Sequence, residues 1–301
     1  MNGVGGKIAR IGIIGSGTVG LIVGRGLKQL GNKVVFHDIQ EKRVKELRAK
    51  GLFATTDLNQ LVAGTEISFL CVPTPTKGGK IDLSHVKSAV KNLAKALRKK
   101  SGYYLVVVKS TVAPKTTEKV IVPLIEKASG KKAGRDFGVC MNPEFLTEIH
   151  DSWTESCAYA RDFFSEDRIV VGELDKKSGD KLVALYKPLR RPIIRTDLKT
   201  AEIIKYACNC ALASRISYWN EIYFICQKLG VDSNLVAQVA GMDERIGKYG
   251  TVHGKAFGGK CLPKDLEAFI AFSEGLGHEP KLLKAVEDVN RKIKDKRGVR
   301  E

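Results

Sequence analysis

The stretch Ile14-Gly15-Ser16-Gly17-Thr18-Val19-Gly20 decides the fold, because it joins an apolar strand to a glycine-rich turn and a helix. The apolar run over residues 7–14 predicts the strand, and the helical pattern after the turn ends at Gly31. Gly15 permits the tight turn, Gly17 lets the backbone approach a pyrophosphate, and Gly20 lets the helix pack closely on the strand. The phosphates would lie at the helix N-terminus, where N–H groups and the helix dipole favour an anion.

An acidic residue follows the second predicted strand, at the spacing typical of a dinucleotide site. This strand, Lys33-Val34-Val35-Phe36-His37, ends in Asp38, which lies 23 positions after Gly15. The Asp38 carboxylate would accept hydrogen bonds from ribose hydroxyls and would repel a 2′-phosphate, which favours NAD over NADP. Lys42 and Arg43 nearby leave NADP open as an alternative. Asp38 could also be a turn residue that only closes the strand.

Five further apolar runs predict strands, and helical patterns separate the early ones. The strands are residues 66–71, 104–108, 137–140, 168–171 and 193–195, and the helices include residues 83–99 and 116–128. Strands that alternate with helices predict an α/β fold with a parallel, doubly wound Rossmann sheet. We expect this NAD-binding domain to span residues 1–196, and an all-helical domain with a long central helix to span residues 197–301.

Three polar loops follow predicted strands at the edge where a doubly wound sheet binds ligands. They are Val72-Pro73-Thr74-Pro75-Thr76, Ser110-Thr111-Val112 and Asn142-Pro143-Glu144-Phe145-Leu146. Because the carboxyl ends of parallel strands meet at one edge, we expect these loops to form one site. Each proline taken alone would indicate only an ordinary turn.

A long helix is predicted over residues 199–229, capped by Thr196 or Asp197 and closed by Gly230. Lys205 and Asn209 are four residues apart and share one face, where an ammonium and a carboxamide could hold an oxygen or a water. A solvated surface pair is the alternative. Apolar neighbours favour a functional role over that alternative; they are Ile203, Ile204, Cys208, Leu212 and Ile216.

A reactive cysteine is predicted in Gly258-Gly259-Lys260-Cys261-Leu262-Pro263-Lys264-Asp265. The two glycines let a substrate approach the backbone, and the flanking lysines favour the thiolate. Taken alone, the stretch could equally be a turn with a small buried residue. Five other cysteines lie in apolar runs and are predicted to be core residues: Cys71, Cys140, Cys208, Cys210 and Cys226. The sequence predicts no disulfide framework and no metal site.

The charge of the chain bears on its partners. Its 301 residues carry a formal charge of +18, with lysines spread along predicted helices and not interleaved with aromatic residues. This pattern favours a solvated surface over a nucleic-acid site, and a phosphorylated substrate fits either reading. No apolar run is long enough to span a membrane, and no signal peptide precedes the first strand. We therefore expect a cytoplasmic protein without nucleic-acid or membrane partners.

Together these motifs resemble the UDP-glucose/GDP-mannose dehydrogenase family over almost the whole chain. The resemblance is carried by the glycine-rich turn, the three loops, Lys109-Ser110-Thr111-Val112-Ala113-Pro114, the Lys205 and Asn209 pair, and the Cys261 segment, in the order of the family. Members oxidise the primary alcohol of a nucleotide sugar to a carboxylate, using two NAD and a cysteine. The resemblance thus implies NAD as cofactor and a nucleotide sugar, of the UDP-glucose type, as substrate.

The resemblance also implies a catalytic role for each polar residue of the site. Cys261 would trap an aldehyde as a thiohemiacetal, which a second oxidation converts to a thioester for hydrolysis. Lys205 and Asn209 would stabilise the alkoxide and the oxyanion. Asp265 would activate or order water together with Lys205. Thr111 and Glu144 would help to position water and sugar.

Binding roles follow from the same resemblance. NAD would be held by Gly15, Ser16, Gly17, Thr18, Val19, Gly20, Asp38, Arg43, Val72, Pro73, Thr74, Pro75, Thr76, Ser110, Thr111, Glu148 and Lys264. The substrate would be held by Glu144, Phe145, Leu146, Glu148, Lys205, Asn209, Arg245, Phe257 and Gly258, with Arg245 reaching across a dimer interface. The helix over residues 282–296 is similar to the dimerisation helix of the family, and an exposed apolar face on it would suit a homodimer.

The sequence departs from the family in three places. Family members carry a third, carboxyl-terminal nucleotide-binding domain, which we expect to be absent because the chain stops at Glu301. Val252-His253-Gly254-Lys255-Ala256 replaces a glycine-rich, lysine-bearing sugar loop, and Ile149 stands where the family has glycine. These departures affect the expected substrate-binding residues and leave the expected catalytic residues intact.

Two other functions stay compatible with the sequence. A β-hydroxyacid dehydrogenase has a similar length and a helical lysine with an asparagine four residues on, but it performs one hydride transfer and needs no cysteine. A basic, non-catalytic NAD-binding scaffold or subunit would fit the expected absence of the third domain and the high positive charge. The presence of Cys261, Lys205, Asn209 and Asp265 opposes the scaffold, and the Cys261 segment opposes the single-step enzyme.

Overall fold

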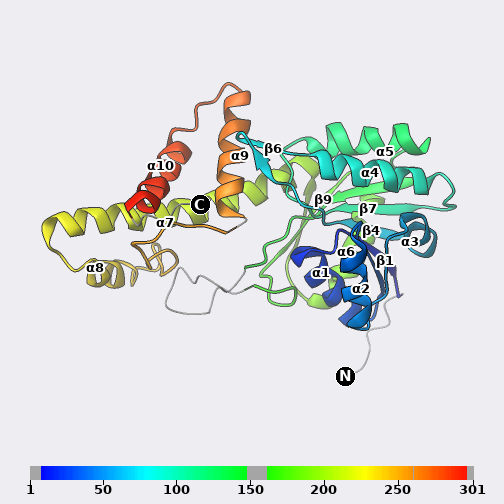
Figure 1. Ribbon diagram of the computed structural model, residues 1–301, viewed down its shortest axis with the longest axis horizontal. Coiled ribbons are helices and arrows are strands. Elements are labelled where there is room, and N and C mark those ends of the chain that lie inside the picture. The colour runs from blue at the N-terminus through cyan, green and yellow to red at the C-terminus, as the bar shows by residue number, and fades with distance from the viewer. Residues whose placement is uncertain (1–7, 148–160, 260, 297–301) are drawn as a thin grey trace. The chain divides into compact units, whose positions relative to one another are not determined.

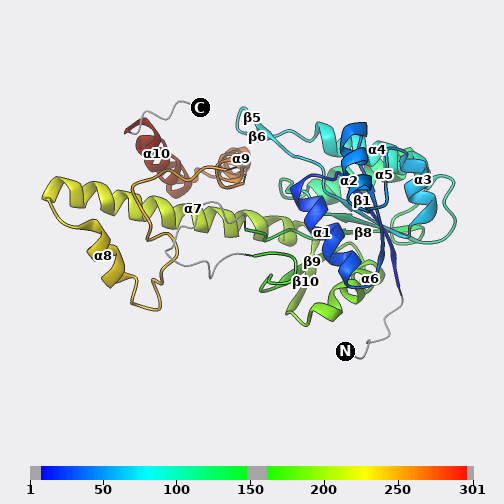
Figure 2. The ribbon, with the colours of Figure 1, turned by 60° about the horizontal axis from the view of Figure 1, so that its bottom comes forward.

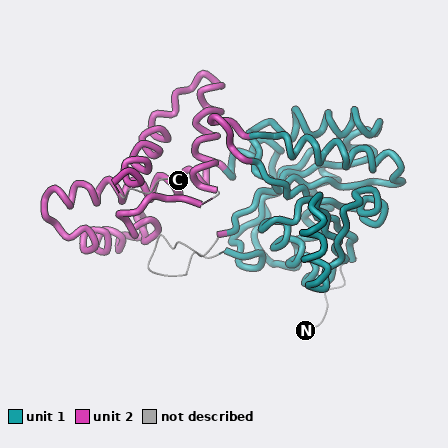
Figure 3. Tube along the Cα trace, in the orientation of Figure 1, with its two compact units in different colours: residues 1–74, 82–146, 161–205 teal, residues 75–81, 147–160, 206–301 magenta. Residues whose placement is uncertain are grey.

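The computed structural model describes residues 8–147, 161–259 and 261–296. The chain divides into two compact units (Figure 3). Unit 1 comprises residues 1–74, 82–146 and 161–205, and unit 2 comprises residues 75–81, 147–160 and 206–301. The domains expected over residues 1–196 and 197–301 stay a prediction, because compactness alone does not establish a unit of folding or function.

Unit 1 is built on an eight-stranded sheet with the order β10-β9-β8-β7-β4-β1-β2-β3. The strands are β1 (Arg10–Ile14), β2 (Lys33–His37), β3 (Ala54–Thr55), β4 (Ile67–Leu70), β7 (Tyr104–Val108), β8 (Phe137–Met141), β9 (Ile169–Glu173) and β10 (Ile193–Asp197). Every strand predicted from the sequence is present, and the two-residue β3 is an addition. Six of the strands, from β3 to β8 in the sheet order, are joined in parallel as predicted.

One strand pair runs against the predicted direction. β8 and β9 are antiparallel, with Cys140 opposite Glu173 and Met141 opposite Gly172, and β10 is parallel to β9. The sheet is therefore mostly parallel rather than wholly parallel. Continuous apolar runs are typical of strands buried on both faces, and such a run carries no information on strand direction.

Helices cover both faces of the sheet (Figure 1). The first apolar cluster joins the sheet to α1 (Thr18–Gln29), α2 (Glu41–Ala49) and α6 (Lys176–Tyr186), and the second joins it to α3 (Leu58–Gly64), α4 (Ser84–Leu97) and α5 (Val122–Ser129). Successive strand residues point to opposite faces, so Ile13 lies in the first cluster and Ile14 in the second. This arrangement confirms the doubly wound fold.

The helix expected over residues 116–128 is interrupted. Thr117–Ile121 forms a π-helical turn, and α5 begins at Val122 with Pro123 in its first turn. Proline has no N–H to donate to the preceding turn, and its ring crowds that turn. The α-helical hydrogen-bond ladder therefore starts after the π-helical turn.

The helix α7 (Leu198–Leu229) has 32 residues and contributes to both units (Figure 2). Asp197, one of the two predicted capping residues, caps it. The Oδ1 of Asp197 accepts a hydrogen bond from the Thr200 N–H at 3.0 Å, and its Oδ2 accepts one from the Thr200 hydroxyl at 2.7 Å. Residues 198–205 of α7 belong to unit 1 and residues 206–229 to unit 2.

Unit 2 contains the rest of α7 with α8 (Ser233–Ala240), α9 (Leu262–Gly275) and α10 (Lys281–Lys296). It also contains an antiparallel hairpin of β5 (Thr76–Lys77) and β6 (Lys80–Ile81), which comes from outside residues 197–301. The elements described within residues 198–296 are helices, with α7 as the long helix, as the sequence predicted. The apolar positions of α10 are divided between the surface and the core, with Leu282 70% exposed. The exposed apolar face that would suit a homodimer stays a prediction. Val286 and Ile293 are 5% and 2% exposed, and Val286 packs with Leu266 in the core of the unit. Among the described helices, none is long and apolar enough to cross a membrane.

A buried carboxylate on α7 binds the chain that follows β7. The side chain of Glu202 is fully buried, and its two oxygens accept hydrogen bonds from the Lys115 N–H at 2.6 Å and the Thr117 N–H at 2.8 Å. Burial raises the pKa of Glu202 to about 7, and the nearby Glu118 carboxylate adds to the increase. These bonds also hold Lys115 in the left-handed conformation, with φ +72°.

We expect Glu202 to make the stability of the fold depend on pH near neutrality. A carboxyl whose pKa is raised in the folded state stabilises the fold below its unfolded pKa and loses that contribution as the pH rises through the folded pKa. From pH 5 to pH 8 the loss should be on the order of 2–3 kcal/mol relative to Glu202→Gln, which does not ionise. Thermal unfolding midpoints of both proteins at the two pH values measure it. Parallel pH profiles for the two proteins would contradict the expectation.

Candidate active site

The glycine-rich turn between β1 and α1 leaves room for a phosphate. Gly15 has φ +90°, and a Cβ there would lie 2.8 Å from the Cys71 carbonyl oxygen. A Cβ on Gly20 would overlap the Gly15 carbonyl oxygen, whereas one on Gly17 would meet no atom within 4 Å. In the described chain, no side chain caps α1 and no acidic residue occupies its first turn. The turn therefore fits a pyrophosphate in space and in charge.

Asp38 and Arg43 both bind this turn. The Asp38 carboxylate accepts hydrogen bonds from the N–H groups of Ser16 and Gln40, each at 3.0 Å. Arg43 donates from Nε to the Ser16 carbonyl oxygen at 2.9 Å and pairs with Glu46 at 3.1 Å. Because Arg43 is held by protein groups while Asp38 keeps a partly exposed carboxylate, the turn suits a ribose with free hydroxyls better than a 2′-phosphate.

Ser110 connects the loops that follow β4 and β7. Its hydroxyl lies 2.7 Å from the Val72 carbonyl oxygen and 3.2 Å from that of Leu70. Thr74 is buried, Thr111 is half-buried and Pro73 is exposed. The structure thus brings together, in unit 1, the loops after adjacent strands of the sheet, as the sequence predicted.

A buried cluster of charges lies where the loop after β8 meets the first part of α7. The ammonium of Lys205 lies 2.9 Å from Glu144 Oε1 and donates to the Glu144 carbonyl oxygen at 2.7 Å. A second ammonium, that of Lys109, donates to Asn142 Oδ1 at 3.0 Å and to the Pro143 carbonyl oxygen at 3.2 Å. All three charged side chains are less than a tenth exposed. Two cations therefore surround one carboxylate.

The pKa of Glu144 follows from this cluster. Burial would by itself raise the pKa, but the Lys205 ammonium, helped by Lys109 and by a hydrogen bond from the Leu146 N–H at 2.8 Å, holds it below the ordinary value. Glu144 is therefore ionised at neutral pH and completes the ion pair with Lys205.

Lys109 and Asn142 form part of the cluster, although the sequence analysis gave Lys109 no role in the site and named Asn142 only as part of its loop. Asn142 is 1% exposed, and its amide is satisfied by Lys109, by the Tyr186 hydroxyl at 2.7 Å and by the Val170 carbonyl oxygen at 2.7 Å. The signal that could have identified Lys109 is its position, since an ionisable residue directly after a buried strand must find partners. The partners themselves come from distant segments and cannot be read from spacing.

Other predicted substrate residues of unit 1 lie next to this cluster. The ring of Phe145 lies under the Arg168 guanidinium, 4.2 Å from it, and 5.6 Å from the Lys205 ammonium. Its N–H donates to Glu166 at 3.2 Å. Leu146 is half-buried. The prediction for Glu148 lies outside the described residues.

A second polar cluster lies in unit 2, around the beginning of α9. Asp265 is 1% exposed and accepts hydrogen bonds from Asn209 Nδ2 at 2.6 Å and from Lys264 Nζ at 2.5 Å. Cys261 immediately precedes α9, its side chain is exposed, and its carbonyl oxygen accepts from the Asp265 N–H at 2.9 Å. The side chains of Asn209 and Asp265 are thus bonded to each other, and Cys261 is linked to Asp265 through the backbone of α9. That the three act together stays a prediction.

Two buried asparagines fix the backbone that leads to Cys261. Asn220 on α7 accepts from the Gly254 N–H at 2.8 Å and donates to the Lys255 carbonyl oxygen at 3.0 Å. Asn290 on α10 accepts from the Phe257 N–H at 2.8 Å and donates to the Phe257 carbonyl oxygen at 3.0 Å. The sequence analysis missed both residues, because a single asparagine on a helix face gives no sign of its partner.

The predicted binding residues of unit 2 have the following surroundings. The Phe257 ring is 1% exposed because it packs in the core of the unit, and its contact with a substrate stays a prediction. Arg245 is exposed and pairs with Asp243 at 2.6 Å. Thr76 donates its hydroxyl to the Lys264 carbonyl oxygen at 3.1 Å, so these two residues, predicted to hold NAD, bind each other. Pro75 is half-buried beside them, and Gly258 is exposed.

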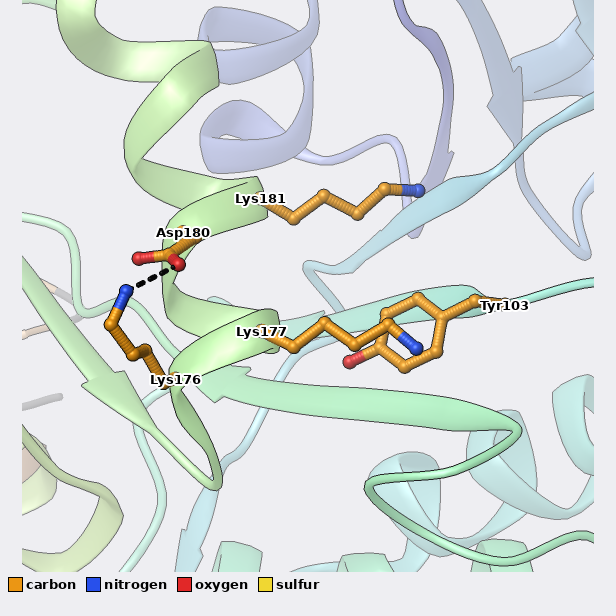
Figure 4. Close-up of a pocket in the computed structure, with 5 residues that line it drawn as sticks. All are labelled: Tyr103, Lys176, Lys177, Asp180 and Lys181. Carbon is orange, nitrogen blue, oxygen red and sulfur yellow. Dashed lines mark hydrogen bonds and ion pairs between the residues drawn. The ribbon is translucent and has the colours of Figure 1, made fainter.

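A basic hollow at α6 contains none of the predicted site residues. It is lined by Tyr103, Lys176, Lys177, Asp180 and Lys181 (Figure 4). Lys176 pairs with Asp180 at 2.8 Å, and the Lys177 ammonium lies 3.8 Å from the centre of the Tyr103 ring. Protein groups already partner these cations, so we assign no part of the active site to this hollow.

A doubly wound sheet with a phosphate-binding turn, joined to helices that carry a lysine, an asparagine and an exposed cysteine, defines an NAD-dependent dehydrogenase. The NAD-binding domain of the UDP-glucose/GDP-mannose dehydrogenase family matches residues 48–190, and the central domain of that family matches residues 199–292. The chain therefore belongs to the UDP-glucose/GDP-mannose dehydrogenase family, and its cofactor is NAD, as the sequence predicted.

Similar proteins agree with this assignment. UDP-glucose 6-dehydrogenase AglM of Haloferax volcanii is 40% identical, over 93% of this chain and 69% of the relative. GDP-mannose 6-dehydrogenase of Pseudomonas savastanoi is 37% identical, over 92% of this chain and 67% of the relative. The structure of a UDP-glucose dehydrogenase from Pyrobaculum islandicum has a TM-score of 0.89 and 35% identity, over 97% of this chain and 70% of that one.

One solved structure bears on the single-step alternative. A 3-hydroxyisobutyrate dehydrogenase of Mycobacterium tuberculosis has a TM-score of 0.70 with 16% identity, over 96% of this chain and 94% of that one. At this identity the similarity shows a shared fold and nothing about the reaction.

We expect Lys205→Met to destabilise the protein by about 3–5 kcal/mol at neutral pH, because it leaves the Glu144 carboxylate buried without its closest cation. In the native protein the depressed pKa of Glu144 gives stability that is present above its unfolded pKa and is lost as the pH falls. In the variant, burial instead favours protonated Glu144, so the damage should shrink at low pH. Thermal midpoints at pH 5 and pH 8 test this. The control is Lys205→Met with Glu144→Gln, which should recover part of the loss; no recovery would refute the account.

We expect Asp38→Asn to weaken NAD binding about tenfold, because a charged acceptor of ribose hydroxyls contributes about 1.5–3 kcal/mol. The variant should also narrow the preference for NAD over NADP, because the charge that repels a 2′-phosphate is gone. Dissociation constants for both cofactors, from calorimetry, measure the effect. Asp57→Asn, which keeps a good N-cap for α3, is the control. An unchanged NAD to NADP ratio would rule out the assigned role of Asp38.

Proposed function

We propose that this protein oxidises the primary alcohol of a nucleotide sugar, of the UDP-glucose or GDP-mannose type, to a carboxylate in two successive steps. The observation that carries the proposal is Cys261, exposed at the start of α9, with Asp265 of the same helix bonded to Asn209. The names of the relatives at 37–40% identity support the substrate class. A single oxidation would need no nucleophile, whereas a cysteine adds the covalent step that a second oxidation requires.

The chemistry proceeds from alcohol to acid through a covalent intermediate on Cys261. NAD, when bound, accepts one hydride in each of the two oxidations. The first oxidation gives an aldehyde and releases a proton from the alcohol. The Cys261 thiolate adds to that aldehyde, and the alkoxide so formed takes up a proton to give a thiohemiacetal. The thiohemiacetal loses the second hydride and a proton to become a thioester. Water then cleaves the thioester to the carboxylate, with release of two protons, and regenerates the thiolate.

The cations of the site stabilise the oxygen at each step. Lys205, four residues before Asn209 on α7, would bind the developing alkoxide and later the oxyanion, together with the Asn209 amide. Lys109 adds a second positive charge to the cluster around Glu144, so the ion pair leaves a net positive field. The N-terminus of α9 favours the Cys261 thiolate through the helix dipole.

Water would be activated by the carboxylates. Asp265, held by Asn209 and Lys264, would accept a proton from the water that attacks the thioester. Glu144 and Thr111 would orient the sugar and a water. These roles, and those of the binding residues named from the sequence, are part of the proposal.

A homodimer is the second part of the proposal, through a surface other than α10. Apolar side chains that are 39% to 71% exposed occur along the end of α7 and around α8; they are Ile225, Leu229, Val231, Leu235, Val239, Met242 and Ile246. Exposed apolar side chains in such number are typical of an interface between subunits. A second copy of the chain, related by a two-fold axis, would bury them. The cytoplasmic location stays a prediction.

We expect two NADH per sugar oxidised when the protein is supplied with NAD and a panel of UDP- and GDP-sugars. Cys261→Ser should lower turnover on the order of 10³-fold or more, because the covalent step is lost, while the dissociation constant for NAD stays within about twofold. Absorbance at the NADH band, with sugar consumption followed by chromatography, gives the ratio. Cys226→Ser, which changes a buried thiol of the same unit, is the control.

The alternatives correspond to distinct results. One NADH per hydroxyacid, with Cys261→Ser fully active, would establish the single-step dehydrogenase. NAD binding without turnover on any sugar would support a non-catalytic subunit.

A further inference from the structure

The β5–β6 hairpin belongs to unit 2 although it interrupts the sequence of the sheet domain (Figure 3). Thr76 pairs with Ile81 and Lys77 with Lys80, around a two-residue turn of Gly78 and Gly79. Both glycines have positive φ, +54° and +75°, which is the backbone of a tight type I′ turn. The segment is therefore a short, hydrogen-bonded hairpin rather than a flexible loop.

The hairpin lies along one face of α9. At its base, the Thr76 hydroxyl donates to the Lys264 carbonyl oxygen at 3.1 Å. At its turn, the Gly79 N–H donates to Glu267 Oε1 at 2.9 Å, and a Cβ on Gly79 would lie 3.5 Å from that of Ala271. Lys264, Glu267 and Ala271 are three and four residues apart, so they form one stripe of the helix. The hairpin is thus held at both ends by the helix that begins directly after Cys261.

The other end of the hairpin continues into the loop that follows β4. Only Pro75 separates Thr76 from Thr74, and Val72-Pro73-Thr74-Pro75 contains two prolines, which restrict both their own backbone and that of the residues before them. The Val72 carbonyl oxygen is fixed by the Ser110 hydroxyl at 2.7 Å. A displacement of the loop backbone should therefore also displace Thr76, because the two prolines leave the chain between them little conformational freedom.

We propose that the hairpin couples the cofactor loop to the thiol: NAD bound at residues 72–75 fixes the β5–β6 hairpin, and through Thr76 and Glu267 the hairpin fixes the first turns of α9 and the position of Cys261. Glu267 is a positioning residue, since it acts on Cys261 through α9. The proposal rests on the proposed function for the assignment of the loop to NAD and of Cys261 to catalysis. Coupling of this kind is reciprocal in binding free energy, so the arrangement of α9 that bound NAD favours is also the arrangement that favours NAD.

The test is the rate of Cys261 alkylation by iodoacetamide, with and without saturating NAD, followed by peptide mass spectrometry. In the native protein, saturating NAD should change the rate constant of Cys261 alkylation by about fivefold or more. Fivefold is about the smallest change in affinity typical of coupled sites. Glu267→Gln keeps an Oε1 acceptor for the Gly79 N–H and should retain the NAD effect. Glu267→Ala removes the acceptor and should reduce the effect to less than about twofold, with NAD still bound. Thermal midpoints and NAD dissociation constants of both variants show that each is folded and binds cofactor.

Each other outcome overturns a defined part of the proposal. An NAD effect that persists in Glu267→Ala would mean that the cofactor shields the thiol directly, and the hairpin would have no role. An NAD effect absent from the native protein, with NAD bound, would remove the coupling and leave the proposed function intact. No binding of NAD to the native protein would overturn the coupling and the proposed function together. Loss of turnover in Cys261→Ser is measured independently and tests only the proposed function.

Discussion

A lysine ammonium buried in a protein must be paired. The ion pair of Lys205 with Glu144 determines both the geometry and the charge of the polar cluster in unit 1. Glu144 provides both a side-chain oxygen and its own carbonyl oxygen, so the first part of α7 and the loop after β8 are held in one geometry. Lys109 stands on the other side of the same loop. Because the two cations exceed the single carboxylate by one charge, the cluster favours any group that becomes negative near it. The charge balance that keeps the carboxylate ionised is therefore also suited to stabilise an alkoxide.

The helix α7 gives the second constraint. It carries Glu202, Lys205 and Asn209 on consecutive turns, and each binds a different part of the chain: the segment after β7, the loop after β8 and the start of α9. A continuous helix keeps these three groups at fixed spacing along its axis.

Much of unit 1 could be predicted from the sequence, because its signals are local. The glycine turn, the buried strands and Asp38 all depend on residues close together in the chain, and the structure has them where spacing places them. The direction of β9, the depth of the Phe257 ring and the burial of Val286 and Ile293 on α10 depend on tertiary packing, and the sequence pattern carries no information on them. Asn220 and Asn290 were missed for the same reason, since each binds backbone more than thirty residues away.

The two asparagines bind only the backbone of residues 254–257 and not the side chains. Lys255 and Ala256 can therefore change without loss of the four hydrogen bonds that hold the segment in shape. A loop fixed in this way tolerates variation in its side chains while its path is preserved, as in antibody loops on a rigid framework. For protein engineering, positions 255 and 256 form a small library site where side chains can be varied with limited risk to folding.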